Sequence, residues 1–280
     1  MRNIRMVTTF YQNREYYEGA FIEWYSKHFE CNEFMFFIGE DEFTNATHNI
    51  YGQPYRIEEE TVDGVTLRRL FYPWGKSRVG DAQRAWHGQK QRMWRIMREG
   101  FPEKPSLICD CDEFIYTKNL DRCLAEGRMP THFYEHVPTE DGTFSLDDTH
   151  TWCEQGWYYG EQFKARERGE ECRINHNHCK EFYFGRVPHT SDFLHMGPAN
   201  SYCDDQKSYQ DYENICFHVS VVNYEHFKGT KQWSHLGEGQ TEMDIDQLNK
   251  EIFTRDYLTV DKNYATFPLR LNDLLGRKSG

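Results

Sequence analysis

The strongest constraint in this chain is an apolar stretch that acidic residues interrupt. Residues 106–115 read Ser-Leu-Ile-Cys-Asp-Cys-Asp-Glu-Phe-Ile, and a short apolar run of this kind is typical of a buried strand. Residues two apart in an extended strand point to the same side, so the pattern predicts that Asp110 and Asp112 direct their carboxylates at one point. Two carboxylates at the end of a buried strand are costly unless a cation binds there, and a divalent cation with oxygen ligands fits best.

An Asp-x-Asp pair also occurs by chance, usually in a solvated turn. Here the pair directly follows an apolar strand, which itself follows a predicted amphipathic helix at 81–99. Ligands of open α/β sheets bind at the carboxyl ends of the strands. The position of the pair therefore favours a metal site over a surface turn.

Alternating patterns predict an α/β fold for the first half of the chain. Strands are expected at 4–10, 34–38 and 65–72, with helices from residue 13 or 14 onwards and at 81–99. The first helix has apolar residues at the i, i+3, i+4, i+7 and i+8 positions of one buried face, namely Tyr17, Ala20, Phe21, Trp24 and Tyr25. The order strand, helix, strand, helix, strand indicates a parallel sheet. The glycine fingerprints of dinucleotide-binding folds and P-loop ATPases are missing, which weakens both assignments.

The second half of the chain is less regular. A short helix is expected between Asn119 and Gly127, and a later helix at 243–253. Strand candidates and a closing segment are spread between long polar loops, at 132–136, 157–159, 182–184, 215–222 and 268–275. Long loops in a compact domain are often functional, so we expect some of them to contribute to a binding site.

Charge and cysteine content limit the partners and the compartment. The net charge of −12 argues against a nucleic-acid polymer as partner but allows a single nucleotide, whose charge a metal and a few basic side chains can neutralise. Nine cysteines leave at least one unpaired, no signal peptide is visible, and no apolar run has transmembrane length. We therefore expect a reduced, soluble, cytoplasmic protein without a membrane span. The sequence gives no indication of the oligomeric state.

Four segments, taken in order, resemble one family of enzymes. They lie at 13–25, 36–41, 83–94 and 107–115, and the last carries an Asp-x-Asp-Glu-Phe block. This order is similar to GT-A glycosyltransferases of the family-2-like and family-92-like type, which have such a block after an equivalent helix. The resemblance implies an α/β GT-A fold with a mixed central sheet flanked by helices. It also implies a single domain over 1–280, with a nucleotide-sugar-binding half at 1–125 and an acceptor-binding half with C-terminal closure at 126–280.

The same resemblance implies a metal ion and a sugar donor. In this family the Asp-x-Asp pair binds Mn²⁺ or Mg²⁺, which bridges the diphosphate of a nucleotide sugar, here expected to be UDP-linked. Asp112 is expected to be a direct ligand. Asp110 is expected to contact the metal, directly or through water, or the ribose and sugar of the donor. A further ligand is expected from the second half, with His218 as first choice and His226 as second.

Donor and acceptor contacts are also implied by the resemblance. The donor is expected to contact Thr9, Phe10, Tyr11, Asp41 and Gln83, with Lys228 or Lys231 at the leaving diphosphate. An inverting enzyme needs a carboxylate that deprotonates the acceptor hydroxyl. The candidates for this base are Asp192, Glu154 and the pair Asp204–Asp205.

The length and the aromatic-rich composition are similar to glycosyltransferases of large algal viruses. This implies xylose as the transferred sugar, a glycan hydroxyl as acceptor and the host cytoplasm as the location. Two other functions stay open: a metal-dependent nucleotidyl- or phosphotransferase, and a non-catalytic carbohydrate-binding protein in which the acids only hold calcium. A separate zinc site is a further alternative, with ligands among Cys172, His176, His178, Cys179 and Cys203.

Overall fold

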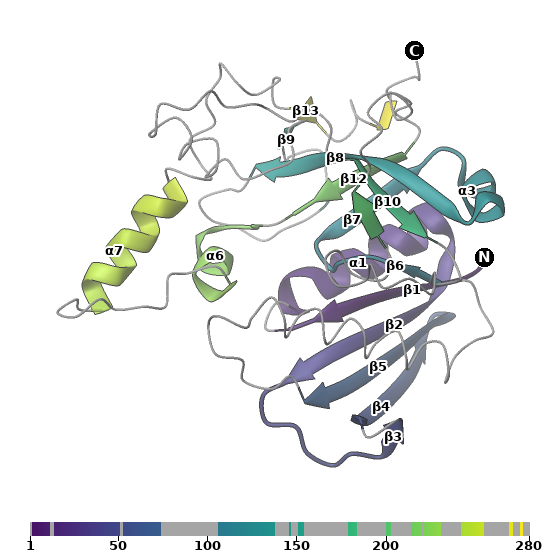
Figure 1. Ribbon diagram of the computed structural model, residues 1–280, viewed down its shortest axis with the longest axis horizontal. Coiled ribbons are helices and arrows are strands. Elements are labelled where there is room, and N and C mark those ends of the chain that lie inside the picture. Colours follow the sequence, from purple (N-terminus) through teal and green to yellow (C-terminus); the bar gives the residue numbers. More distant parts are fainter. Residues whose placement is uncertain are drawn as a thin grey trace.

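The computed structural model describes residues 2–11, 14–50, 53–73, 106–137, 146, 151–153, 179–183, 200–202, 214–219, 221–230, 242–254, 269–270 and 275–276. These residues form two β-sheets and several helices, an α/β architecture whose strands have mixed orientation (Figure 1). The predicted helix at 81–99 and the predicted strand at 157–159 lie outside the described residues.

The first sheet is parallel except at one edge. Its strands span His48–Ile50 (β3), Gln53–Val62 (β4), Val65–Pro73 (β5), Cys31–Glu40 (β2), Arg2–Phe10 (β1) and Ser106–Ile108 (β6), in that spatial order. β5, β2, β1 and β6 are parallel, whereas β4 pairs antiparallel with β5, and β3 with β4. The predicted parallel sheet is therefore confirmed, with an antiparallel edge added. That edge is a hairpin in which Asp63 (φ 52°) and Gly64 (φ 81°) make a two-residue turn.

Both faces of the first sheet are buried, which explains why 34–38 is an unbroken apolar run. Phe34 and Phe36 belong to the main core, whereas Met35 and Phe37 belong to a second cluster. Side chains alternate between the two faces of a strand, so these two clusters lie on opposite faces of the sheet. Continuous apolar strands of this kind are typical of parallel sheets that are covered on both sides.

The first helix, α1 (Arg14–Phe29), packs one face against the sheet and begins where the sequence predicts. Its buried residues recur every three to four positions: Tyr17, Phe21, Trp24, Tyr25 and Phe29. The ring of Phe21 packs edge-to-face on Phe36 of β2, and its centroid lies 6.3 Å from that of Phe114, which belongs to the second sheet. α1 therefore lies between the two sheets and shares a core with both (Figure 1).

The second sheet collects strands from the rest of the chain. They span Asn200–Tyr202 (β11), Cys179–Tyr183 (β10), Arg128–Val137 (β8), Asn214–His218 (β12) and Glu113–Thr117 (β7), in that spatial order. Thr151–Cys153 (β9) pairs with β8, and Leu269–Arg270 (β13) pairs with β9. β12 is parallel to β8 and antiparallel to β7. The predicted strand at 215–222 ends earlier, at His218, because the chain then turns into helix α6 (Tyr224–Thr230).

Two further helices agree with the sequence patterns. α3 (Leu120–Glu126) starts at Asn119, whose side chain accepts a hydrogen bond from the Arg122 amide, and ends at Gly127 in a left-handed conformation (φ 71°). α7 (Glu242–Phe253) matches the predicted helix at 243–253 and packs Phe253 against Phe227 of α6.

Candidate metal and nucleotide site

The Asp-x-Asp pair lies in a tight turn that joins the two sheets. β6 ends at Ile108 and β7 begins at Glu113. The Glu113 amide donates to the Asp110 carbonyl at 3.1 Å, and the buried Glu113 carboxylate accepts from the Asp110 amide at 2.8 Å. The pair follows a buried strand as predicted, but the expected extended conformation through 110–112 is wrong, because the chain must change direction here to pass from one sheet to the other. The side-chain directions of Asp110 and Asp112 are set by this turn and not by strand alternation.

The turn brings Asp112 next to His218, the predicted ligand from the second half. β12 pairs antiparallel with β7 so that His218 lies opposite Glu113, and the Val219 amide donates to the Asp112 carbonyl at 2.8 Å. As a result, His218 Nε2 lies 3.5 Å from Asp112 Oδ2. The two side chains are 24% and 26% exposed, so both are anchored by the fold yet accessible to solvent.

A carboxylate and an imidazole are both common ligands of divalent metal ions, with the carboxylate oxygen suited to Mn²⁺ or Mg²⁺ and the imidazole nitrogen to transition metals. Within the described ranges, no three His, Cys, Asp or Glu side chains lie close enough together to form a metal site by themselves. Asp110 is partly exposed on the same turn but does not complete such a group. The residues present therefore fit an ion that has two protein ligands and several positions open to water or to ligand oxygens.

A second pair of predicted site residues meets at the ends of β1 and β2. The Tyr11 hydroxyl donates to both carboxylate oxygens of Asp41, at 3.0 and 3.1 Å. Burial, followed by the hydrogen bond to Asp41 and its negative charge, raises the pKa of Tyr11 to about 12. Tyr11 consequently remains a protonated hydrogen-bond donor at neutral pH.

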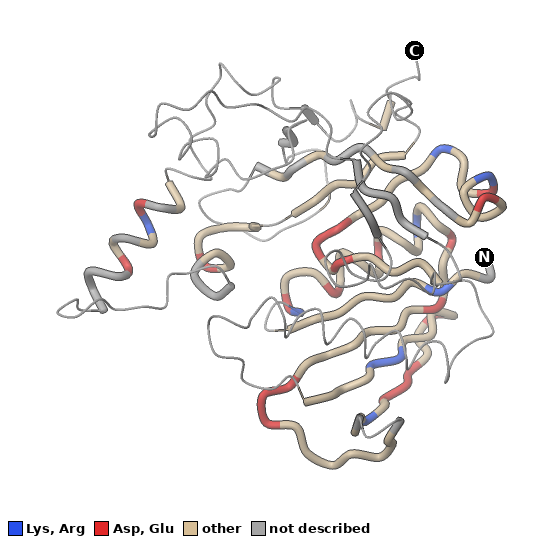
Figure 2. The backbone as a smooth tube through the Cα atoms, viewed as in Figure 1, with Lys and Arg blue, Asp and Glu red and all other residues tan. Residues whose placement is uncertain are grey.

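Both pairs lie toward the edge of the first sheet where the parallel strands end. β1 lies between β2 and β6. The strands β2 to β5 therefore lie on one side of β1, whereas β6, the next strand along the chain, lies on the other side. Val7 pairs with Ile108, so Tyr11 and Asp110 leave the sheet toward the same edge. Figure 2 shows acidic residues both in the loop after β2 and in the turn between β6 and β7. Ligands of α/β sheets bind at such a switch point.

The other predicted donor contacts on β1 have buried side chains. Phe10 lies in the main core with its ring edge-to-face on Phe36 at 5.0 Å, and Thr9 is also buried. Of the three predicted contacts at 9–11, only Tyr11 therefore has a side chain that is partly exposed.

His226, the second choice for a metal ligand, is instead part of a buried hydrogen-bond network. Its Nδ1 accepts from the Val222 amide at 3.2 Å, and its Nε2 lies 3.3 Å from the Tyr17 hydroxyl. Both ring nitrogens are thus used inside the protein, and His226 serves the fold instead of a metal ion.

Sequence reasoning missed the tyrosines of α1 as polar residues. Tyr17 donates to the Val219 carbonyl at 2.6 Å, while Tyr25 donates to the Glu113 carbonyl at 2.8 Å. The sequence does carry a signal for these bonds: tyrosine, not phenylalanine, occupies two predicted buried positions of the helix, and a buried hydroxyl usually has a hydrogen-bond partner.

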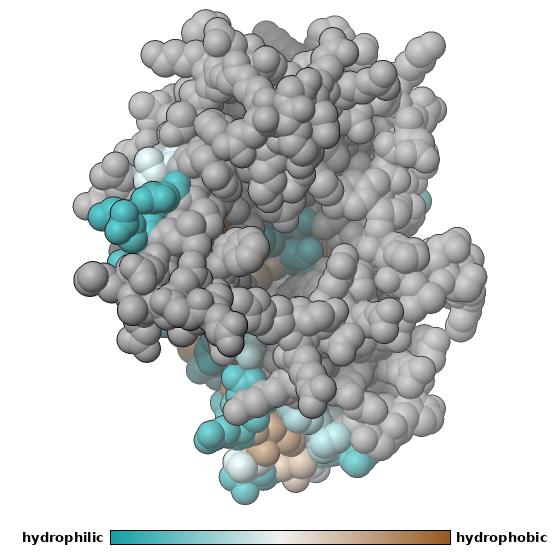
Figure 3. Space-filling model, turned by 60° about the vertical axis from the view of Figure 1, so that its left-hand side comes forward, coloured by the Kyte–Doolittle hydropathy of each residue, from teal (hydrophilic) through white to brown (hydrophobic). Residues whose placement is uncertain are grey.

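Several predicted site residues cannot be placed next to these pairs. Gln83, Glu154, Asp192, the pair Asp204–Asp205 and most of the alternative zinc ligands lie outside the described residues. The backbone of Lys228 lies in α6, but its side chain is not described. In the face drawn in Figure 3, the described residues at the lower end are mostly hydrophilic, with a small apolar group among them.

Comparisons with known proteins assign no family to this chain. No family model, curated protein or solved structure matches the chain. Among the described residues, no helix has both the length and the apolar character needed to cross a membrane.

Proposed function

We propose that this protein is a metal-dependent glycosyltransferase of the GT-A type, which moves a sugar, with xylose as first candidate, from a UDP-linked donor to a glycan hydroxyl with inversion. The observation that carries the proposal is the contact between Asp112 and His218, which come from distant parts of the chain. This pair lies on the turn that follows a parallel strand, toward the sheet edge where Tyr11 and Asp41 also meet. Such an edge is where α/β proteins bind nucleotides.

In this proposal Asp112 and His218 hold Mn²⁺ or Mg²⁺. A bound ion supplies Lewis-acid stabilisation of the negative charge that grows on a departing diphosphate. Ions of this kind commonly take one or two protein carboxylates and complete their shell with phosphate oxygens, which matches a site with two protein ligands. Asp110, on the same turn, would contact the metal, directly or through water, or bind the ribose and sugar of the donor.

The Tyr11–Asp41 pair supports a nucleotide at the same edge. Tyr11 presents an aromatic ring on which a planar base can stack. Asp41 is exposed, and a carboxylate can accept hydrogen bonds from the N–H groups of a base or the hydroxyls of a ribose. Because Tyr11 stays protonated at neutral pH, it holds the Asp41 carboxylate in one orientation.

The test is release of UDP from UDP-sugars in the presence of Mn²⁺, with and without a glycan acceptor. We expect Asp112→Asn to lower Mn²⁺-dependent UDP release at least about 100-fold, since it removes the charged ligand while conserving shape. The matched control is Asp63→Asn in the β4–β5 turn, because asparagine tolerates the left-handed conformation there. We expect this control to release UDP at the wild-type rate.

Other products would overturn the proposal in different ways. Release of pyrophosphate from nucleoside triphosphates would favour a nucleotidyltransferase that uses the same metal pair. Binding of glycans without turnover of any nucleotide would favour a carbohydrate-binding protein. UDP release that Asp112→Asn leaves intact would show that the chemistry occurs elsewhere in the chain.

A further inference from the structure

We propose that Tyr17 and His226 are positioning residues that hold His218 against Asp112, and that they act through the backbone of Val219. The inference rests on the proposed metal site, because it assigns a role to the residues behind the two ligands. Neither residue contacts the ion in this proposal. Their effect is on how firmly the ligand pair is held before an ion binds.

The first step is a directed chain of hydrogen bonds. The Val222 amide can only donate, so His226 Nδ1 must be the acceptor at 3.2 Å, and the neutral ring then carries its proton on Nε2. His226 Nε2–H donates to the Tyr17 oxygen at 3.3 Å, and the Tyr17 hydroxyl donates to the Val219 carbonyl at 2.6 Å. These hydrogen bonds run in one consistent direction, from the Val222 amide to the Val219 carbonyl.

The second step is that both the amide and the carbonyl of Val219 are hydrogen-bonded. The β7–β12 ladder ends at His218, so Val219 lies beyond the last strand pair. Its amide donates to the Asp112 carbonyl at 2.8 Å, and its carbonyl accepts from Tyr17. Because His218 directly precedes Val219, these two bonds fix the backbone that directs the imidazole toward Asp112.

The third step is burial, which makes the network rigid. Tyr17, Val219 and His226 are each at most 2% exposed. The Tyr17 and His226 rings also meet edge-to-face, with centroids 5.4 Å apart. Hydrogen bonds in such a dry environment are costly to break, and groups behind metal ligands typically change metal affinity 10- to 100-fold when they are removed.

The test measures the Mn²⁺ dissociation constant by electron paramagnetic resonance of the free ion, with no substrate or turnover involved. We expect Tyr17→Phe to weaken Mn²⁺ binding about 10-fold, since the Val219 carbonyl loses its partner. The control is Thr117→Val, which removes the buried hydrogen bond from Thr117 to Asn214 (2.6 Å) at the opposite end of the same β7–β12 ladder. It destabilises the sheet by a similar mechanism, and we expect it to leave the Mn²⁺ affinity unchanged.

Two substitutions of His226 separate its two bonds. His226→Gln can present an amide donor near the position of Nε2, whereas His226→Asn presents an acceptor near Nδ1 only. If His226 acts through Tyr17, the glutamine variant binds Mn²⁺ more tightly than the asparagine variant. The double variant Tyr17→Phe/His226→Asn should then be no weaker than Tyr17→Phe alone, because both changes break one chain.

The outcomes distinguish this inference from the proposed function. If the wild-type protein fails to bind Mn²⁺, the metal site itself is overturned, and the inference with it. If the wild-type protein binds Mn²⁺ and Tyr17→Phe binds it equally tightly, the positioning role alone is overturned. Equal weakening by Thr117→Val would mean that loss of stability, and not position, explains the effect.

Discussion

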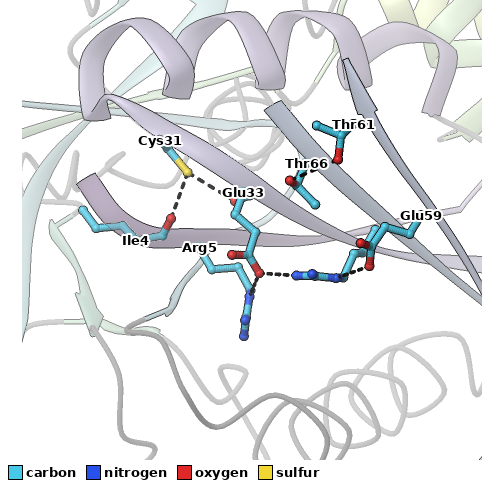
Figure 4. A network of polar contacts seen from close by, with 8 residues as sticks. Ile4, Arg5, Cys31, Glu33, Glu59, Thr61 and Thr66 are labelled. Atoms are coloured by element: carbon cyan, nitrogen blue, oxygen red, sulfur yellow. Dashed lines mark hydrogen bonds and ion pairs between the residues drawn. The ribbon is translucent and has the colours of Figure 1, made fainter. Parts of the chain in front are cut away.

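Glu33 of β2 is a buried carboxylate that pairs with two arginines, one on each neighbouring strand of the first sheet. Its Oε1 accepts from Arg5 Nε at 2.7 Å and from Arg68, which also donates to Glu59 at 2.6 Å (Figure 4). Arg5 and Glu33 are almost completely buried, whereas Glu59 is half exposed. A buried charge that loses its partner is far more costly than an exposed one.

Replacing Glu33 should therefore destabilise the protein severely. We expect Glu33→Ala to lower the free energy of unfolding by about 3–5 kcal/mol, because buried Arg5 would lose the carboxylate that accepts from its Nε. Glu59→Ala is the matched control and should cost at most about 1 kcal/mol, as exposed pairs do. Urea unfolding at pH 7 measures both, and equal losses in the two variants would contradict this account.

His28 is a partly buried histidine whose titration should affect stability. Burial, followed by the charge of Lys27, lowers the pKa of His28 from 6.5 to about 4. Its ring packs on Trp24, with centroids 4.1 Å apart. Between pH 6.5 and 4 the unfolded chain binds a proton at His28 and the folded protein does not, so the contribution of this group to stability is lost as the pH falls through that window.

Urea unfolding at pH 7 and pH 5 tests this for the wild-type protein and His28→Phe. Phenylalanine keeps a ring beside Trp24 but does not titrate. We expect the wild-type protein to lose more of its unfolding free energy than the variant when the pH falls to 5. The same pH dependence in both proteins would show that His28 is protonated normally in the folded state.

At the scale of elements, α1 protects the free edge of a strand. Among the described strands, β7 is the last of the second sheet on its side, so half of its backbone groups face away from β12. Two neighbouring residues of α1 satisfy them: Tyr25 donates to the Glu113 carbonyl and accepts from the Ile115 amide at 3.0 Å, and Trp24 donates to the Ile115 carbonyl at 2.6 Å. The helix thus joins the sheets by hydrogen bonds as well as by packing.

Tyr25→Phe should loosen this junction. It removes the tyrosine hydroxyl from two buried backbone groups, each such bond worth about 1–3 kcal/mol, and we expect lower stability together with faster hydrogen exchange of the Ile115 amide. Tyr55→Phe on β4 removes a hydroxyl from the far edge of the first sheet and serves as control. An Ile115 amide that exchanges equally slowly in both variants would mean that Tyr25 does not hold the β7 edge.

At the scale of the whole molecule, the turn at 110–113 is the point where the two sheets are joined in sequence. α1 bridges the same sheets in space, and residues from both share one core. The candidate site is therefore built where covalent connection, helix packing and strand ends coincide. This arrangement holds the side chains of the candidate site on the backbone of two packed sheets, which the proposed orientation of a donor would require.

Periodicity in the sequence was sufficient to determine local structure: β1, β2, β5, α1 and α7 lie close to where apolar spacing predicts them. The acidic pair between two apolar runs also identified where a polar site interrupts the core. These features depend on neighbours within a few residues, so the chain encodes them directly.

The tertiary structure alone decided which distant residues meet. The approach of His218 to Asp112 depends on the register between β7 and β12, and the loss of His226 as a ligand depends on Tyr17 of α1. The physical reason is that a one-residue shift in strand pairing turns every side chain to the other face, and the sequence of one strand does not contain its partner's register.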